Sequence, residues 1–442
     1  MSVPAESIPQ ESQIQDRDLD GATINEVPIG GDEEAIKDEK AVYDDFPDGG
    51  LRAWTVVAGI RWLICPHSFG YVNSWGVFQS YYEENVLPDT SASAIAWIGS
   101  IQYALVFIPG LVTGRLFDLG YLKAPLFLAT CVFVVATFLV AECTKYWHFL
   151  LCQGIVTGFA CGIIFGPMMG IIGHWFRRKR GLALGMNAIG SSMGGTIFPI
   201  AARNLIKRVG FPWTMRILGF IILVALSVPN LVLQRRLPPK KVAGGLVNPK
   251  AFKYLPFTIY CLSGIVAFLG LYTVLTYIDV SATKAGVSED FSFYLVSIAN
   301  ASSSLGRLGA GILTDKYGAI NVMAPLTLIC AVMTYAWPFA RSQGSLIAIA
   351  VLYGVPSGAY VSNFLIPLYE MGEVEDIGRR TGMAMTFAAC GALAGPPISG
   401  AIYGQTGGYE AVGYYAGSMI VAAVSMMLLV RFMVLRKFWG KF

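Results

Sequence analysis

One arginine stands inside an apolar stretch of the sequence. Arg307 lies within the segment from residue 291 to 314, and the chain leaves that segment through Asp315, Lys316 and Tyr317. A guanidinium at membrane depth costs roughly 2.5–3.5 kcal/mol on insertion scales, so a chain that keeps one has a use for its charge. If the side chain faces a cavity, its planar fork can pair with the oxygens of a carboxylate, an enolate or a phenolate. The alternative is a structural arginine that bonds to backbone carbonyls or to another helix.

The exit from that apolar segment occurs twice in the chain. Residues 306–318 read GRLGAGILTDKYG, and residues 114–123 read GRLFDLGYLK after an earlier apolar segment. Only the second copy is preceded by a deep cation in the apolar run. A duplicated helix exit of this kind is typical of a membrane transporter built from two repeated lobes.

Apolar segments long enough to cross a bilayer follow one another along the chain. Crossing about 30 Å takes about 20 helical residues. We place twelve spans near residues 53–79, 93–117, 122–141, 147–173, 182–205, 212–234, 255–278, 290–314, 319–340, 344–370, 381–403 and 409–434. The predicted fold is an all-α membrane protein with twelve transmembrane helices in two six-helix halves.

Composition supports the membrane class and sets the predicted domains. The chain is 55% hydrophobic and 14% charged, whereas soluble domains average about 25% charged residues. Of the 28 acidic residues, 14 fall in the first 50 positions. We therefore expect a disordered acidic tail at 1–47, either plainly solvated or regulatory. The halves are expected at 48–234 and 255–434, with a cytoplasmic linker at 235–254 and a short tail at 435–442.

The basic residues predict the orientation. Most Lys and Arg outside the spans lie in loops that follow even-numbered spans or at the end of the chain, which predicts that both termini are cytoplasmic. Arg203, Lys207 and Arg208, in the fifth loop, are the exception. The basic residues form no single stripe, which disfavours a nucleic-acid partner. The expected surroundings are a lipid bilayer, with the plasma membrane as the expected location, and an accessory subunit is left open.

Glycines of the fourth span share a helix face. They stand four residues apart at 154, 158, 162, 166 and 170, which lets a neighbouring backbone approach closely. Tight packing is the default interpretation. The alternative is a face on which two helices slide during a conformational change.

Three segments together resemble a known family. Asp48 to Trp54 (DGGLRAW) is similar to the signature that opens helix 1 of monocarboxylate-transporter-like members of the major facilitator superfamily, in the form found in fungi. Phe176 to Gly195 resembles the signature of that family at helix 5. The segment 306–318 resembles its helix 8 with a buried arginine, which in the family contacts substrate.

The chain also departs from that family in two places. Animal members have a lysine in helix 1, where this chain reads YVNSW at 71–75, and their helix 8 aspartate is Ser303 here. Both charged partners of a lactate-type proton symport site are therefore replaced, which disfavours lactate and pyruvate as substrates.

The resemblance implies which helices line a central cavity. Polar and aromatic residues on those helices are the candidates, and they predict a partly aromatic pocket around Arg307. They are Tyr71, Asn73, Trp75, Met168, Asn187, Tyr272, Asn300, Ser303, Tyr360 and Asn363. His67 is either a proton relay or a packing residue. We find no carboxylate near the middle of a span, so the sequence gives no support to proton coupling through a dedicated acidic side chain.

The resemblance also implies a gate. Asp118 and Asp315 follow the ends of two helices and can accept hydrogen bonds from helix N-termini, which would latch the cytoplasmic side shut; Gly114 and Gly311 lie in the same motifs. Replacing either aspartate is expected to hinder switching between states rather than binding.

The predicted function is a secondary transporter that moves a small organic anion or a polyketide-like metabolite by alternating access, as an exporter tied to a secondary-metabolite pathway. A nutrient importer and a metabolite sensor that signals through the acidic tail are the alternatives. We find no metal-ligand cluster, nucleophile–base spacing or phosphate-binding loop, and the eight cysteines have no paired spacing. The sequence therefore predicts no enzyme, no metal and no cofactor.

Overall fold

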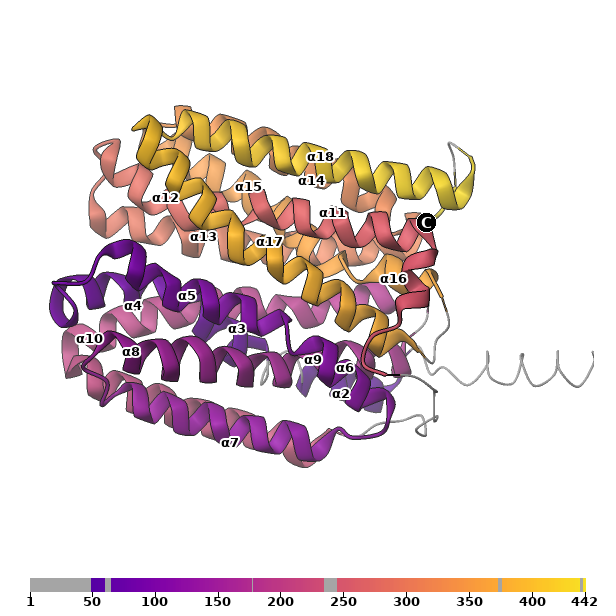
Figure 1. The fold of residues 1–442 in the computed structure, drawn as a ribbon, viewed down its shortest axis with the longest axis horizontal. Helices are drawn as coiled ribbons and strands as arrows, with labels where there is room; N and C mark the ends of the chain where they lie inside the picture. The colour runs from indigo at the N-terminus through magenta and orange to yellow at the C-terminus, as the bar shows by residue number, and fades with distance from the viewer. Residues whose placement is uncertain (1–48, 60–64, 177, 234–244, 373–375, 438–439) are drawn as a thin grey trace, which may run out of the picture. The chain divides into compact units, whose positions relative to one another are not determined.

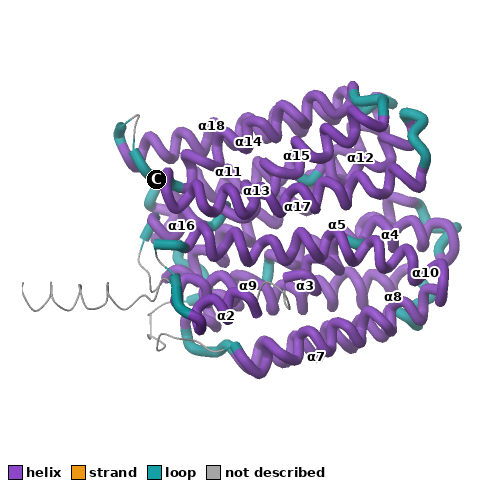
Figure 2. The backbone as a smooth tube through the Cα atoms, turned by 180° about the vertical axis from the view of Figure 1, so that it is seen from behind, coloured by secondary structure: helices purple, strands orange, loops and turns teal. Residues whose placement is uncertain are grey.

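The computed structural model describes residues 49–59, 65–176, 178–233, 245–372, 376–437 and 440–442. The whole predicted acidic tail (1–47) and part of the linker lie outside these ranges. Within them the chain is helical, with short turns and no strand. Figure 2 shows the loops gathered at the two ends of the helical bundle.

The first half of the chain forms the helices coloured indigo to magenta in Figure 1. Two of them, η2 and η3, are π-helical stretches. The bounds are α2 (Leu51–Gly59), α3 (Cys65–Asn73), α4 (Trp75–Tyr81), η2 (Tyr82–Val86), α5 (Ala92–Phe107), α6 (Gly110–Asp118), α7 (Lys123–Val140), α8 (Tyr146–Phe149), η3 (Leu150–Thr157), α9 (Gly158–Trp175) and α10 (Arg180–Val232).

The second half forms the helices coloured from rose through orange to yellow in Figure 1. Here η4 and η5 are short 3-10 helices. The bounds are η4 (Pro249–Lys253), α11 (Leu255–Leu271), α12 (Thr273–Lys284), α13 (Glu289–Tyr317), α14 (Ala319–Ala336), η5 (Trp337–Phe339), α15 (Gln343–Asn363), α16 (Ile366–Glu370), α17 (Ile377–Thr406) and α18 (Glu410–Leu435).

Each of the twelve predicted spans coincides with helix, although the breaks differ from expectation. Nine of the described helical segments are long and apolar enough to cross a membrane. One of them, α10, holds the fifth and sixth spans, which meet at Gly210 (φ 77, ψ 166). The described parts of the first span are α2, α3 and α4, and residues 60–64 between α2 and α3 lie outside the described residues. The eighth span, α13, lies outside the nine because Asn, Ser and Arg residues interrupt its apolar character.

Local sequence sets several helix ends. Ser91 caps α5 by accepting a hydrogen bond from Ala94 N at 3.3 Å, and Ser342 forms a capping box with Ser345 at the start of α15. These side chains satisfy N–H groups that have no partner in the first turn of a helix. Gly318 (φ 95) ends α13, in a backbone region that L side chains rarely adopt.

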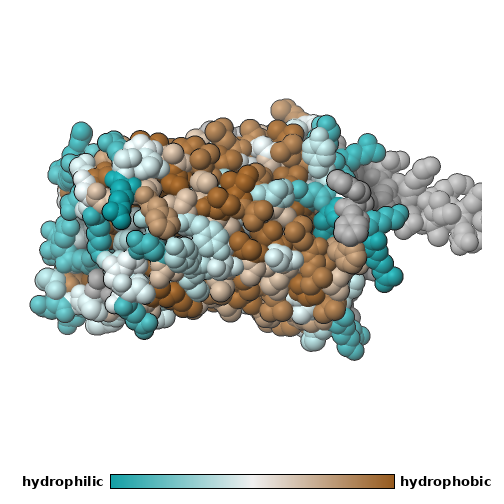
Figure 3. All heavy atoms as spheres, turned by 90° about the horizontal axis from the view of Figure 1, so that it is seen from above, coloured by the Kyte–Doolittle hydropathy of each residue, from teal (hydrophilic) through white to brown (hydrophobic). Residues whose placement is uncertain are grey.

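The surface follows the pattern expected of a membrane protein. Figure 3 shows apolar side chains over the middle of one face and polar side chains at both ends. Large apolar residues such as Leu128 and Val224 are exposed on α7 and α10. A band of this kind can face lipid, while the charged ends face water.

The glycine face of the fourth span packs against the second span, as its spacing predicts. A Cβ on Gly158 would lie 2.9 Å from Gln102 O, and one on Gly162 would lie 2.4 Å from Leu105 O. Both neighbours are backbone atoms, so only glycine allows α9 to approach α5 this closely. The contact fits the tight-packing interpretation and holds the first half together beside the cavity described next.

Candidate functional site

A cavity lies where helices of the two halves face one another. Its empty volume is about 1010 Å³, the space at its mouth included. Six of the predicted residues line it, together with side chains that the sequence did not single out. The lining comprises Phe69, Asn73, Tyr103, Phe107, Phe165, Leu184, Asn187, Ala188, Ser191, Phe268, Leu271, Tyr272, Leu275, Ala299, Asn300, Ser303, Arg307, Ser357, Gly358, Val361, Ser362, Phe364, Leu365 and Met385.

The Arg307 side chain both lines the cavity and forms hydrogen bonds within the protein. Its side chain lines the cavity, and its Nη1 donates to Ala188 O at 3.1 Å and to Ser191 Oγ at 2.8 Å. This geometry therefore combines the two interpretations of Arg307, a side chain that faces a cavity and a side chain that bonds to another helix. A guanidinium has five N–H donors, and these two bonds orient the fork from α10.

Polar side chains around Arg307 come from two helices that face each other. From α10, Asn187 and Ser191 reach the cavity, and from α13, Asn300 and Ser303 do so. The Ser303 hydroxyl lies 2.6 Å from Ser192 Oγ and donates to Asn300 O at 2.7 Å. These contacts join α10 to α13 and make this side of the cavity polar.

Aromatic side chains form much of the rest of the cavity lining. Phe69, Phe165 and Phe364 contribute to it, and ring pairs from the two halves close it: Tyr103 and Tyr272 have centroids 5.0 Å apart, and Phe107 and Phe268 lie 5.9 Å apart. Aromatic faces bury a large apolar area and favour flat guests. The cavity thus offers both polar and apolar contacts.

Asn73 is held by a neighbour in the same half. Its Oδ1 accepts a hydrogen bond from the Tyr103 hydroxyl. The amide nitrogen of Asn73 lies on the other side of the group, 2.8 Å from the point where a Cβ on Gly195 would stand. The side chain is thus fixed in orientation, with its N–H₂ turned toward α10.

Four of the residues predicted to surround Arg307, and also Met168, lie outside the lining of the cavity. Tyr71 and Tyr360 are fully buried among other aromatic rings, and Asn363 and Met168 are fully buried as well. Trp75 donates from Nε1 to Gln79 Oε1 at 2.8 Å on its own helix. The backbone of His67 is helical, but its side chain is outside the described residues.

Several lining residues carry no signal in the sequence. Tyr103, Phe107 and Phe268 stand in uniformly apolar runs, where hydropathy locates the span but not the face that meets the cavity. Helical spacing offers one hint, since Tyr103 and Phe107 stand four residues apart and so share a face. Among the described residues, no group of three or more His, Cys, Asp or Glu is placed to hold a metal ion.

Asp315 forms the first of two clasps between the halves. Its Oδ1 accepts from Gly181 N at 2.7 Å and its Oδ2 accepts from Leu182 N at 2.9 Å. Both N–H groups belong to the first turn of α10, where the helix dipole also favours a negative charge. The carboxylate at the end of α13 therefore holds the start of a helix from the other half.

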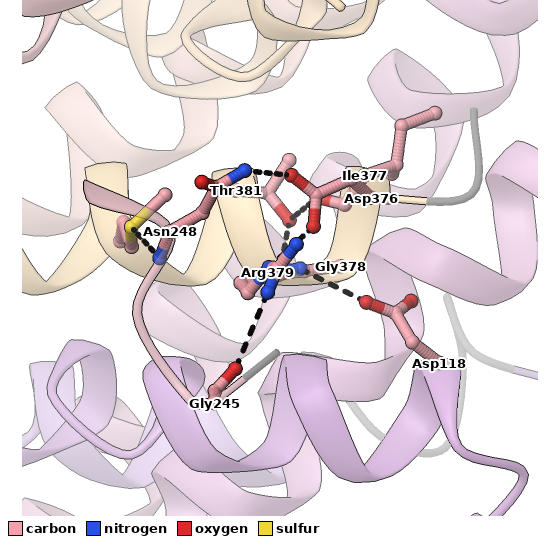
Figure 4. A network of polar contacts seen from close by, with 9 residues as sticks. Asp118, Gly245, Asn248, Asp376, Ile377, Gly378, Arg379 and Thr381 are labelled. Atoms are coloured by element: carbon pink, nitrogen blue, oxygen red, sulfur yellow. Dashed lines mark hydrogen bonds and ion pairs between the residues drawn. The ribbon is translucent and has the colours of Figure 1, made fainter. Parts of the chain in front are cut away.

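Asp118 forms the second clasp with the halves exchanged. Its Oδ2 accepts from Arg379 N at 3.1 Å, in the first turn of α17. Figure 4 shows this carboxylate facing the first turn of α17. The duplicated motif of the sequence thus produces duplicated contacts, one on each side of the same end of the bundle.

The two glycines predicted to act in the gate explain how the clasped helices come so close. A Cβ on Gly311 would lie 2.5 Å from Gly181 O, and one on Gly114 would lie 2.2 Å from Gly378 O. Such distances to backbone atoms exclude any side chain. Glycine at these positions therefore allows α13 to meet α10 and α6 to meet α17 at the clasps.

The described end of the linker joins the second clasp. Arg379 pairs with Asp376 and donates from Nη1 to Gly245 O at 3.4 Å, while Asn248 Nδ2 donates to Asp376 Oδ2 at 2.8 Å. Figure 4 shows these residues around the start of α17. The connection between the halves is thereby tied to the helix that Asp118 holds.

The profile of the Major Facilitator Superfamily matches residues 62–366 and 257–439 of this chain. The chain belongs to the major facilitator superfamily. It is therefore a multi-pass membrane protein with the superfamily's fold of two six-helix halves, and members of the superfamily are transporters.

Curated relatives from fungi extend over most of the chain. MFS transporter asaE of Aspergillus flavus is 36% identical over 392 residues, 88% of this chain and 88% of the relative. Aspyridones efflux protein apdF of Emericella nidulans is 36% identical, and the match covers 88% of this chain and 81% of the relative. Fujikurins efflux protein of Gibberella fujikuroi is 34% identical and covers 90% and 86%.

Solved structures share the fold at low identity. The human organic anion transporter MFSD10 matches with a TM-score of 0.66 and 15% identity, over 85% of this chain and 99% of that one. The Escherichia coli fucose:proton symporter FucP matches with a TM-score of 0.66 and 13% identity, over 83% and 97%. These likenesses show the fold alone.

Proposed function

We propose that this transporter exports an organic anion made by a fungal secondary-metabolite pathway, by alternating access around Arg307. The observation that carries the proposal is the position of Arg307 in a cavity lined by both polar and aromatic side chains. Several relatives are named efflux proteins or transporters of fungi. We also infer membership of the monocarboxylate-transporter-like branch from the signatures at helices 1, 5 and 8.

The clasps support alternating access. Asp315 and Asp118 hold helix N-termini of the opposite half at one end of the bundle, and the distribution of basic residues predicts that this end is cytoplasmic. We infer that the described conformation is closed on the cytoplasmic side. Transport then requires both clasps to open so that the anion can enter from the cytoplasm, with both chain termini on that side of a plasma membrane.

Arg307→Ala tests the site. We would compare metabolites inside and outside cells of a strain that lacks the gene and carries either the wild-type chain or a variant. Truncating one partner of a buried charge pair costs about 2–5 kcal/mol, so we expect Arg307→Ala to reduce efflux at least thirtyfold at unchanged membrane abundance. Arg307→Lys keeps the charge but loses the fork, and we expect partial efflux.

Arg203→Ala is the matched control, because Arg203 pairs with an Asp290 side chain that is 85% exposed and exposed pairs contribute little. Normal efflux by Arg307→Ala would refute the proposed site. Accumulation of an external compound inside cells that carry the wild-type chain would favour import, the alternative direction. Unchanged transport by a chain without residues 1–45 would favour the transporter over a sensor that signals through the acidic tail.

A further inference from the structure

The polar side of the cavity has two separate points that can bind a guest. Arg307 and Asn300 stand seven residues apart on α13, and both line the cavity. Seven residues of α-helix span about 10.5 Å. Ser303 lies between them, and its hydroxyl is already bonded to Ser192 Oγ and Asn300 O. Ser303, in the middle, therefore has its hydrogen bonds within the protein. Along α13, polar contacts to a ligand are expected at the two ends, Arg307 and Asn300.

The end away from Arg307 holds a pair of amides from both halves. Asn300 is 8% exposed, and Asn73 on α3 is half-buried. A Cβ on Gly195 would lie 2.8 Å from Asn73 Nδ2 and 3.2 Å from Asn300 Nδ2. The sum of these distances limits the separation of the two nitrogens to 6.0 Å. Because Gly195 has no side chain, the amides of Asn73 and Asn300 can lie this close to each other.

The existing hydrogen bonds decide what each amide offers. Asn300 Nδ2 donates to Gly195 O at 3.3 Å, so its oxygen is the atom that can accept from a guest. Asn73 Oδ1 accepts from the Tyr103 hydroxyl, so its nitrogen is the atom that can donate. One acceptor beside one donor is the complement of a carboxamide or lactam, which supplies an N–H and a C=O together.

We propose that the substrate is an anion that carries a carboxamide or lactam about two helical turns from its charge, with Asn73, Asn300 and Gly195 as the residues that select it. The inference rests on the proposed function, since it takes Arg307 as the anion contact. Recognition of the amide raises specificity because a guest without it would leave buried polar groups of the pair unbonded.

Two synthetic anions form a matched probe pair. Biphenyl-4-carboxylate has the charge and the aromatic body, and 4′-carbamoylbiphenyl-4-carboxylate adds a carboxamide at a distance close to the spacing of Arg307 and Asn300. Affinities would be measured by calorimetry on the full chain in lipid nanodiscs. A net hydrogen bond contributes about 1 kcal/mol, so two bonds predict that the carbamoyl probe binds at least tenfold more tightly to the wild-type chain.

The variants separate this inference from the proposed function. In Asn300→Ala and Gly195→Ala we expect both probes to bind equally, because the first removes the acceptor and the second displaces the Asn73 amide. The Cβ added in Gly195→Ala would contact only side-chain atoms of Asn73 and Asn300, so we expect this variant to keep the fold. Ser227→Ala, on an exposed part of α10 outside the cavity lining, is the control and should keep the tenfold difference. Arg307→Ala should weaken both probes.

Three results would overturn one claim or both. If the wild-type chain binds both probes equally, or if the difference survives Asn300→Ala and Gly195→Ala, the amide inference is wrong and the anion site stands. If biphenyl-4-carboxylate binds Arg307→Ala as tightly as the wild-type chain, the anion site itself is wrong. If neither probe binds the wild-type chain, the cavity does not take such anions and both claims fail.

Discussion

Asp315→Asn should open the end of the transporter that the clasps hold shut. The two oxygens of Asp315 accept from Gly181 N at 2.7 Å and Leu182 N at 2.9 Å. An asparagine keeps one acceptor and turns an NH₂ toward the second N–H group. Hydrogen bonds to charged groups contribute about 1.5–3 kcal/mol, and a charge at a helix N-terminus adds about 0.3–1 kcal/mol.

The loss therefore amounts to about 2–3 kcal/mol of the clasped conformation. Since about 1.4 kcal/mol corresponds to a factor of ten, the equilibrium between clasped and open forms should shift about 30- to 150-fold toward the open form. Asp118→Asn should act in the same direction, because Asp118 holds α17 on the other side of the same end.

Electron paramagnetic resonance can measure this shift. Spin labels at Tyr121→Cys and Tyr317→Cys place one probe in each half at the clasped end, and both positions are exposed. The exposed native thiols Cys131 and Cys390 would first be replaced by alanine. We expect a second, longer distance to appear or grow in the Asp315→Asn variant.

Asp290→Asn is the matched control, since it removes an exposed carboxylate from the other end of α13 and should leave the distances unchanged. An Asp315→Asn variant that folds, accepts both labels and shows the wild-type distance distribution would refute the role of the clasp. A change of equal size in Asp290→Asn would show that the effect is not specific to the clasped end.

Three further predictions follow from single contacts. Gly311→Ala places a Cβ 2.5 Å from Gly181 O, whereas Gly309→Ala meets nothing within 4 Å; the first should lengthen the label distance and the second should not, and equal effects would contradict the close-approach argument. Burial raises the pKa of Cys143, in the loop before α8, from 9.0 to about 12, which disfavours the thiolate. At pH 7.5 N-ethylmaleimide should therefore modify it more slowly than an unperturbed thiol, with the rate rising as pH approaches the raised pKa; mass spectrometry showing ordinary reactivity would contradict this. Asn248→Ala removes the 2.8 Å bond between the linker and the carboxylate that precedes α17, so it should shift the label equilibrium toward the open form by about fivefold, or about 1 kcal/mol, and an unchanged equilibrium would show that the linker contact does not support the clasp.

The sequence predicted the helices well because a membrane span depends on the summed hydropathy of about 20 residues and not on any single one. Twelve apolar runs, one basic linker and a duplicated exit motif indicate two lobes without knowledge of any contact. The gating role predicted for Asp118 and Asp315 came from the family resemblance of the exit motifs and not from composition. The turn at Ser74, which separates α3 from α4 within the first span, was less predictable.

The faces of the helices were harder to predict than the helices themselves. Tyr71, Asn73 and Trp75 alternate along the chain, and residues two apart on a helix point in nearly opposite directions. Only Asn73 lines the cavity. On α15 the cavity takes Ser357 and Ser362, while Asn363 is buried on another face. Composition alone cannot set this rotation, because every face of these helices is apolar enough to meet either lipid or protein.

The sequence predicted a partly aromatic pocket that includes Tyr272, but for a similar reason it could not predict that Tyr103 completes it. Tyr103 and Tyr272 stand in different halves, and their contact at 5.0 Å depends on how the halves pack together. Neither residue interrupts an apolar pattern, as Arg307 does. A charge inside a span is conspicuous in a sequence, whereas an aromatic ring inside a span resembles its neighbours.

A structure of the chain bound to its exported anion, or to 4′-carbamoylbiphenyl-4-carboxylate, would test the central claim most directly. The account predicts that the anionic group of the ligand lies within hydrogen-bonding distance of the Arg307 guanidinium, between α10 and α13, with its apolar body against the aromatic side chains of the cavity. A ligand bound elsewhere, or bound in this cavity with its anionic group turned away from Arg307, would contradict it.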